Sequence, residues 1–210
     1  MGTLLSSFRS PLMLSLQLLL HSRTVRICCA AVIVAGTGSA CRLLKADSSV
    51  HGVGGWGHQI GDGGSAFWIA RRLIQCIFDE EDGLHPSPHP ISKTKRLFLE
   101  FFDLSDKAGI LDILYTNFDK SRIASFAAHV AKEANDDPLV RLVFRDAGEQ
   151  LGLHVRAVSR NFDEEMLHNA RLLLIGSVWR SWELLKDGKI AIRLIRRLDL
   201  FYLYSKETFK

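Results

Sequence analysis

The chain has 210 residues, of which 47% are hydrophobic and 24% charged, enough for one large domain, or for one and a half small ones, with a buried core. Its net charge of +4 is spread along the sequence, which argues against a nucleic-acid-binding surface. The four cysteines form no CxxC pair and no disulfide framework, so we expect a reducing, cytoplasmic compartment.

Residues 1–29 contain basic and apolar residues but no acidic residue. Their composition is similar to that of a weak signal peptide or mitochondrial presequence. Ser15 and Gln17 interrupt the apolar run, which is also too short to span a membrane. We therefore expect an atypical leader outside the folded domain, and no membrane partner.

The first organised segment is AAVIVAG, from Ala30 to Gly36, which is typical of a buried strand. GTGS follows as a turn, and ACRLLK can return as a second strand. The same residues allow a dinucleotide-binding GxGxx motif, but Cys41 occupies the third glycine position and the helix required from Ser39 would be short and rich in turn residues. The sequence therefore favours a β-hairpin, whose tip at Thr37 and Gly38 can bind a phosphate through backbone amides.

The rest of the chain is mainly helical in pattern. Ser65 is a candidate N-cap for a helix that ends in the acidic DEEDG segment, and Asp137 with Pro138 is typical of the start of a long helix. ARLLLIGS predicts a further buried strand, and WRSWELLKDG a short helix closed by Gly188. We expect an α/β fold with a small sheet and many helices. The other expected helices are at about Lys93–Phe102, Lys107–Tyr115 and Lys120–Ala134.

Other familiar sites are not indicated by the sequence. His85 and His89 lie between prolines rather than on one helix face, and nothing completes a tetrahedral metal set, so we expect no metal ligands. No serine lies in a GxSxG motif. The arginines near residue 195 alternate with apolar residues, as in a membrane-surface helix or, more commonly, a partly solvated amphipathic segment.

The segment GVGGWGHQIGDGGS, residues 52–65, contains seven glycines. Such a cluster occurs in flexible surface loops, and also where the backbone approaches a ligand or adopts positive φ. Trp56 is unusual for a flexible linker, and the helix expected after Ser65 holds one end of the segment. Both features favour an ordered, ligand-binding loop.

Several motifs together carry a resemblance to a known family. They occur in the order VAGTGSACRL, GGWGHQIGDGGSAFWIA, FDKSRIASFA, DPLVRLVFRDAGEQLG and IGSVWRSWELLK. In this order and spacing the chain resembles the N-acetyl-D-glucosamine kinases, of the BadF/BadG/BcrA/BcrD ATPase type and the sugar kinase/Hsp70/actin superfamily. The resemblance implies the ribonuclease-H-like (actin-like ATPase) C-terminal lobe of a cytoplasmic enzyme, usually a homodimer. It also implies transfer of the γ-phosphoryl group of MgATP to the 6-hydroxyl of N-acetyl-D-glucosamine.

The resemblance also implies roles for residues of the glycine-rich segment. Gly55, Trp56 and Gly57 correspond to a sugar-binding segment, where missing side chains let the backbone reach the sugar. Asp62 corresponds to a carboxylate that accepts a hydrogen bond from a sugar hydroxyl. We expect these four residues to line one pocket, with the Asp62 carboxylate pointing into it. Gly63 stands where the family usually has glutamate, in a GDEGS motif.

Five further residues correspond to nucleotide-binding positions. Thr37 and Gly38 match the phosphate-binding turn, and Ala124, Ser177 and Ser181 match the nucleotide pocket. For Ala124 and Ser181, close helix packing is nearly as good an explanation as nucleotide binding. ATP and Mg²⁺ are the implied cofactors, with the metal bound alongside the nucleotide rather than in a protein cage.

The sequence departs from the family pattern at both ends. The catalytic aspartate should lie about twenty residues before the GTGS turn, but LSLQLLLHSR, at that position, has no acid, so we assign no catalytic residue. A glycine-rich GGAS-type segment is also absent. We expect a leader at 1–29, a kinase lobe at 30–188 and a divergent tail at 189–210, as in a truncated or alternatively spliced product.

Two functional hypotheses follow. The first is a sugar kinase. The second is a non-catalytic binding or dimerisation module, which could pair with itself or with a full-length kinase. A nicotinamide-dependent dehydrogenase is a much weaker third.

Overall fold

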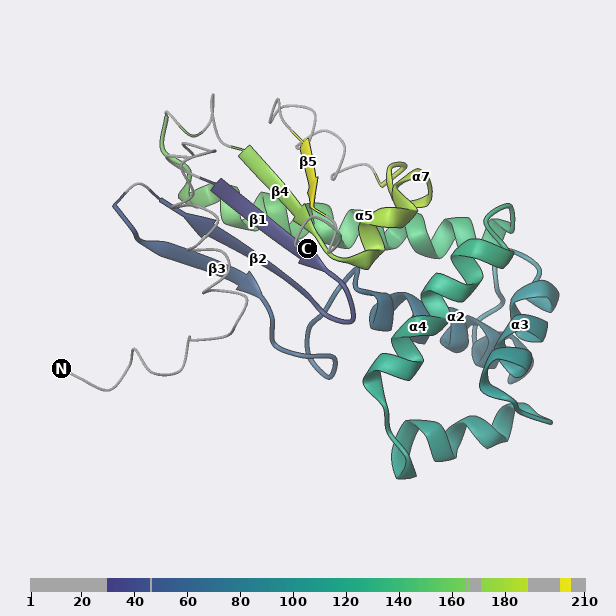
Figure 1. Ribbon diagram of the computed structural model, residues 1–210. Coiled ribbons are helices and arrows are strands. Elements are labelled where there is room, and N and C mark those ends of the chain that lie inside the picture. Colours follow the sequence, from purple (N-terminus) through teal and green to yellow (C-terminus); the bar gives the residue numbers. More distant parts are fainter. Residues whose placement is uncertain (1–29, 46, 165, 167–170, 189–200, 205–210) are drawn as a thin grey trace.

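The computed structural model describes residues 30–45, 47–164, 166, 171–188 and 201–204 (Figure 1). The expected leader at 1–29 lies outside the described residues. So does most of the expected tail at 189–210, apart from residues 201–204.

One five-stranded mixed sheet forms the left part of the molecule in Figure 1, with the strand order β3-β2-β1-β4-β5. β2 (Ser39–Leu44) pairs antiparallel with β1 (Ala30–Ala35) on one side and with β3 (Val50–Gly54) on the other. β4 (Arg171–Ile175) and β5 (Phe201–Tyr204) extend the sheet on the other side of β1 by parallel pairing.

The predicted hairpin between β1 and β2 is confirmed. Ala35 pairs with Ser39, so only Gly36, Thr37 and Gly38 form the connection, and a strand rather than a helix follows. Buried and half-buried residues alternate along β2, as the two-residue period of a strand requires. The dinucleotide-binding alternative loses the helix on which it depends.

Two strands were not expected from the sequence. β3 has the sequence VHGVG, in which two glycines and a histidine hide the apolar alternation that marks a strand. β5 lies in the segment expected to be a divergent tail, yet it pairs with β4 from Leu172 to Ile175. In both cases the backbone pairing of a neighbouring strand specifies the structure more strongly than local side-chain preference does.

The helices largely follow the predicted pattern. Ser65 caps α2, since its Oγ accepts a hydrogen bond from the Trp68 amide at 3.2 Å, and Asp137 caps α5 with proline at the next position. The main helices are α2 (Ala66–Glu81), α3 (Ser92–Phe102), α4 (Lys120–Glu133), α5 (Pro138–Val158) and the short α7 (Trp182–Leu185).

The helix expected at Lys107–Tyr115 is present as one helical run over residues 107–116, but it is irregular at both ends. Lys107–Gly109 is a 3₁₀ turn and Asp112–Thr116 is a π-helical turn. Asp106 accepts hydrogen bonds from the amides of Ala108 and Gly109, which favours a local turn, and glycine weakens a regular helix at this point. A 3₁₀ turn at Ser177–Ser181 likewise takes the first part of the helix expected to end at Gly188.

The core lies between the sheet and the helices. α5 runs along one face of β1, β2 and β3, and α2 packs between α5 and α4 (Figure 1). Phe98, Phe102 and Phe126 fill the helical part with edge-to-face and tilted ring contacts. Within the part of the chain that the structure describes, no helix is long and apolar enough to cross a membrane.

Candidate functional site

The hairpin tip and the glycine-rich segment meet at Ser39. This residue is 3% exposed, and its amide donates to Oδ1 of Asp62 at 3.1 Å while its hydroxyl donates to the Gly63 carbonyl at 2.8 Å. The amide of Gly55 donates to the Ser39 carbonyl at 3.1 Å. Both ends of the glycine-rich segment are therefore bonded to a single position of β2.

The first turn of α2 also contacts the hairpin. The amide of Ala66, at the start of this helix, donates to the carbonyl of Gly36 at 2.8 Å. The Asp62 carbonyl accepts from the Ser65 amide at 3.0 Å, which closes the loop into the helix. The hairpin tip is thus seated on the N-terminus of α2, where amide groups give a positive electrostatic potential.

Asp62 is the central charged residue of this assembly. It is 4% exposed and has a positive φ of 60°. Its Oδ2 atom lies 2.7 Å from Nζ of Lys120, the first residue of α4. The carboxylate therefore connects β2, the glycine-rich segment and α4, and it points back toward the hairpin rather than into an open pocket.

The glycine-rich segment has a defined backbone conformation. Gly54, Gly55 and Gly57 have φ values of +72°, +83° and +81°, which side-chain-bearing residues rarely adopt. A Cβ on Gly54 would lie 2.6 Å from Nε2 of His154, so the close approach of α5 also requires glycine there. Trp56 is 75% exposed between these glycines.

The aromatic side chains beside this segment form a small cluster. His58 stacks on Phe118 with ring centroids 5.0 Å apart and contacts the edge of Phe67 at 4.9 Å. The Lys120 ammonium lies 6.0 Å from the centre of the Phe67 ring. The sugar-binding segment implied by the sequence is therefore packed against the start of α4.

Three of the five expected nucleotide-binding residues lie at one edge of the sheet. β1 and β4 are parallel, so both end there, and a Cβ on Gly176 would lie 2.2 Å from the Ala35 carbonyl oxygen. Thr37 at the hairpin tip and Ser177 after β4 are exposed at this edge. Gly38 is half-buried and lies against the Asp62 carboxylate. The carboxyl ends of parallel strands are a common place for ligands.

The other two lie elsewhere. Ala124 is 3% exposed and packs in the hydrophobic core, which favours the packing explanation for that residue. Ser181 lines a hollow of about 380 Å³ between the α4–α5 junction and α7. Its lining residues are Ala131, Asn135, Asp136, Arg141, Arg180, Ser181, Glu183 and Leu184.

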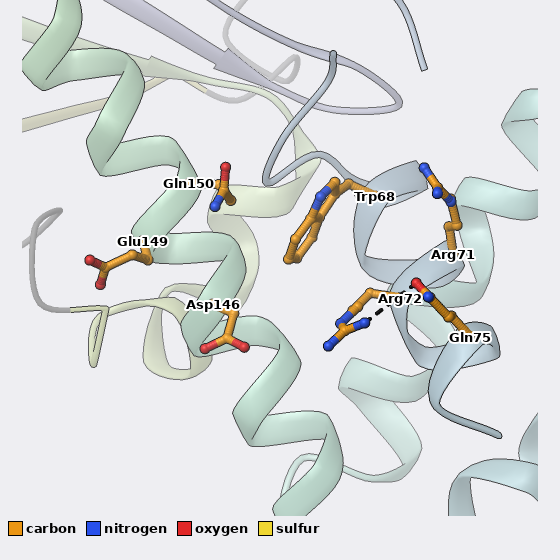
Figure 2. Close-up of a pocket in the computed structure, with 7 residues that line it drawn as sticks. All are labelled: Trp68, Arg71, Arg72, Gln75, Asp146, Glu149 and Gln150. Carbon is orange, nitrogen blue, oxygen red and sulfur yellow. Dashed lines mark hydrogen bonds between the residues drawn. The ribbon is translucent and has the colours of Figure 1, made fainter. Parts of the chain in front are cut away.

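A larger hollow of about 440 Å³ lies between α2 and α5 (Figure 2). Trp68 forms part of its wall on α2, and the Arg72 guanidinium donates to Oε1 of Gln75 at 3.4 Å. None of the residues expected to bind sugar or nucleotide lines it. Its lining residues are Trp68, Arg71, Arg72, Gln75, Asp146, Glu149 and Gln150.

Of the cysteines that the structure describes, Cys41 and Cys76, neither is activated as a nucleophile. Burial raises the pKa of Cys41 to about 12 and also raises the pKa of Cys76, so both are protonated near neutral pH. No group of three or more His, Cys, Asp or Glu residues suited to a metal ion occurs among the residues that the structure describes. The chemistry that this arrangement allows is binding of polar and anionic ligands through backbone amides and charged side chains.

Sequence reasoning missed Lys120, although FDKSRIASFA was identified as a motif. A lysine in the first turn of a helix is unfavourable beside the positive end of the helix dipole. Its occurrence directly after the N-cap Asp119 was a signal that an acidic partner lies nearby. That partner is Asp62, 58 positions earlier.

Several known proteins are similar to this chain. The N-acetylmuramic acid/N-acetylglucosamine kinase of Clostridium acetobutylicum is 26% identical over 129 residues, which are 60% of this chain and 41% of that protein. Crystal structures of proposed N-acetylglucosamine kinases from Chromobacterium violaceum and Porphyromonas gingivalis match with TM-scores of 0.63 and 0.60, at 24% and 18% identity. The matched regions are 82% and 84% of this chain but only 55% and 56% of those two proteins. The chain therefore spans about half the length of each.

The predicted α/β fold of actin-like ATPase type is confirmed by these matches. The sequence pattern of the BadF/BadG/BcrA/BcrD ATPase family matches residues 21–192, which include the hairpin, the glycine-rich segment and α2 to α7. The chain therefore belongs to the BadF/BadG/BcrA/BcrD ATPase family.

Proposed function

We propose that this chain is the nucleotide- and sugar-binding lobe of an ATP-dependent amino-sugar kinase. The reaction is transfer of the γ-phosphoryl group of MgATP to the 6-hydroxyl of N-acetyl-D-glucosamine, in the cytoplasm. The observation that carries the proposal is the seating of the Gly36–Gly38 hairpin tip on the N-terminus of α2, with Ser39 bonded to Asp62. The family membership and the relatives' names support the same reaction class.

The hairpin tip would hold the nucleotide phosphates. Thr37 is exposed and offers a hydroxyl, and a Cβ on Gly36 would have no atom within 4 Å, which leaves space beside the turn for a ligand. Clustered amide groups of this kind bind phosphate oxygens without a charged side chain. Ser177, at the same edge of the sheet, would contact the nucleotide beyond the phosphates. Mg²⁺ would be held by the phosphates, neutralising charge during transfer.

The glycine-rich segment would hold the sugar. Gly55 and Gly57 leave the backbone accessible on both sides of Trp56, whose exposed ring offers an apolar surface to a sugar face or an acetamido methyl. An ionised carboxylate has about four acceptor positions. Asp62 uses two of them for Ser39 and Lys120, and its side chain is 5% exposed, so a sugar hydroxyl would reach a remaining position only after the glycine-rich segment shifts.

The second hypothesis, a binding module without efficient catalysis, is favoured by one sequence observation. The stretch LSLQLLLHSR, where the family places its catalytic aspartate, has no acid. Loss of a general base typically slows a reaction by about 10²–10⁴-fold. We therefore propose that the chain binds its ligands but turns over slowly by itself, and that pairing with a full-length kinase would supply the missing group.

The test uses the purified full chain. Calorimetry should show binding of ADP with Mg²⁺, and weaker binding for the variant Thr37→Val, which removes the hydroxyl but keeps the shape. A coupled assay of ADP release with N-acetyl-D-glucosamine and MgATP should give turnover far below the ~10 s⁻¹ of a typical enzyme. Absence of nucleotide binding would reject the kinase assignment. Turnover within tenfold of the typical value would reject the proposal of slow turnover.

A further inference from the structure

We propose that Lys120 is a positioning residue that fixes the hairpin tip to the glycine-rich segment through Asp62. The inference rests on the proposed function, because it assigns to Lys120 the ordering of the proposed phosphate-binding turn. Lys120 does not touch the hairpin itself. It acts on Asp62, and Asp62 holds the amide of Ser39.

The first step of the argument is burial. The side chain of Asp62 is 5% exposed and that of Lys120 is 29% exposed, which distinguishes this pair from a solvated surface pair. For comparison, Lys132 on the same helix is 84% exposed and pairs with the adjacent Glu133. A buried carboxylate that loses its cation is costly, whereas an exposed pair contributes little.

The second step is the geometry of the carboxylate. Oδ1 faces the Ser39 amide and Oδ2 faces Lys120, so the two bonds hold opposite ends of one planar group. A Cβ atom on Gly38 would lie only 2.9 Å from Oδ1 and 3.0 Å from Oδ2, so the carboxylate packs directly against this glycine. Rotation of the carboxylate would therefore change both the Ser39 hydrogen bond and the packing under the hairpin tip.

The third step is the connection to the other half of the site. Lys120 begins α4 and lies over the Phe67 ring, which contacts His58 in the glycine-rich segment. The same ammonium group is thus linked through Phe67 to His58 in the loop assigned to the sugar, and it contacts the carboxylate that holds the turn assigned to the phosphates. No other lysine or arginine in the described part of the chain forms an ion pair with Asp62.

The experiment compares Lys120→Met with the control Lys132→Met in the full chain. Residue-resolved hydrogen exchange should show the Ser39 amide exchanging about tenfold faster in Lys120→Met, with protection of the α5 core amides retained. Lys120→Arg should restore slow exchange, because it restores the cation. Exchange at Ser39 equal to that of the wild type and of Lys132→Met would overturn the inference, whatever the protein binds.

A second arm uses the affinity for ADP with Mg²⁺, measured by calorimetry. Lys120→Met should weaken binding about tenfold in the wild-type background, but less than threefold in the background of Asp62→Asn, since a neutral amide does not need the cation. An equal loss in both backgrounds would mean that Lys120 contacts the phosphates directly, and would overturn the positioning role. If the wild type binds no nucleotide, the proposed function fails, while the exchange arm still decides the role of Lys120. Asp62→Asn with Lys120→Met also serves as the folding control if Lys120→Met alone unfolds.

Discussion

A Cβ atom on Gly38 would lie 2.9 Å from Oδ1 and 3.0 Å from Oδ2 of the Asp62 carboxylate. The carboxylate cannot move aside without losing the Ser39 amide or the Lys120 ammonium, both of which it binds. A Cβ atom on Gly36, two residues earlier, would have no other atom within 4 Å. The hairpin tip therefore contains one glycine required by packing and one that is not.

From this difference we expect Gly38→Ala to lower the free energy of unfolding by about 1–3 kcal/mol, the range for overpacking at a site that cannot relax. Gly36→Ala, in the same loop, should change it by less than about 0.5 kcal/mol. Urea unfolding followed by circular dichroism measures both. Equal midpoints for the two variants would show that Asp62 moves away from the hairpin at little cost.

The start of α5 gives a second prediction. Oδ1 of Asp137 accepts from the amides of Leu139 and Val140 at 2.9 and 3.1 Å, and the side chain is buried. Asp137→Ala should therefore lower stability by about 1 kcal/mol, the usual effect of losing an N-cap. Asp137→Asn keeps the acceptor oxygen and should lose much less. Thermal unfolding of both variants checks this, and an equal loss would assign the effect to charge instead of to capping.

The buried thiol gives a third prediction. Burial raises the pKa of Cys41 to about 12, whereas an unfolded cysteine has a pKa of about 8.5. The unfolded chain thus releases this proton first, so the contribution of Cys41 to stability is complete below about pH 8.5 and declines as the pH rises toward 12.

The same burial predicts selective alkylation at pH 8. Iodoacetamide should label Cys41 only as fast as the protein opens, and more slowly than the half-buried Cys76. Peptide mass spectrometry gives both rates, and unfolding in guanidinium should make them similar. Faster labelling of Cys41 than of Cys76 in the folded protein would contradict the burial of β2.

The sequence was most informative where local chemistry decides the structure. Ser65 and Asp137 are caps that their neighbours alone identify, and the β1–β2 hairpin follows from an apolar run, a tight turn and the lack of room for a helix. β3 and β5 could not be found in this way, because their pairing partners specify them and their residues do not. The fold class was predictable for the same reason: long periodic helices and one clear strand need no tertiary information.

The candidate site was only half predictable. The pattern identified Asp62 and the glycines, but not that the carboxylate points toward Ser39 and Lys120, which are 23 and 58 positions away. Nor did it indicate that Ala124 faces the core, since alanine has the same spacing pattern in a core and beside a ligand. Contacts across such distances in the sequence depend on how α4 packs on α2, and a single sequence considered alone does not specify that packing.

The last prediction concerns Gly63, which stands where the resemblance implies glutamate. Its φ is not in the left-handed region, and a Cβ there would meet only the Oε1 end of Gln150, at 3.1 Å, with the rest of that side chain at ordinary distances. Because Gln150 can turn, a side chain at this position fits. Gln150 also lines the hollow that contains Arg71 and Arg72, so a carboxylate would extend toward two cations.

We therefore expect Gly63→Glu to stabilise the chain by about 0.5–1.5 kcal/mol. One part is the reduced freedom of the unfolded chain on replacing glycine, about 0.4–1 kcal/mol. The other is the interaction of the carboxylate with the arginines and the N-terminus of α2, about 0.3–1 kcal/mol at low salt. Gly63→Gln isolates the first part, since it has the same shape without the charge, so Glu should exceed Gln in urea unfolding at low ionic strength and approach it at 1 M salt. A Glu variant less stable than the Gln variant at low salt would show that the acidic groups of the hollow, Asp146 and Glu149, outweigh its arginines at this position.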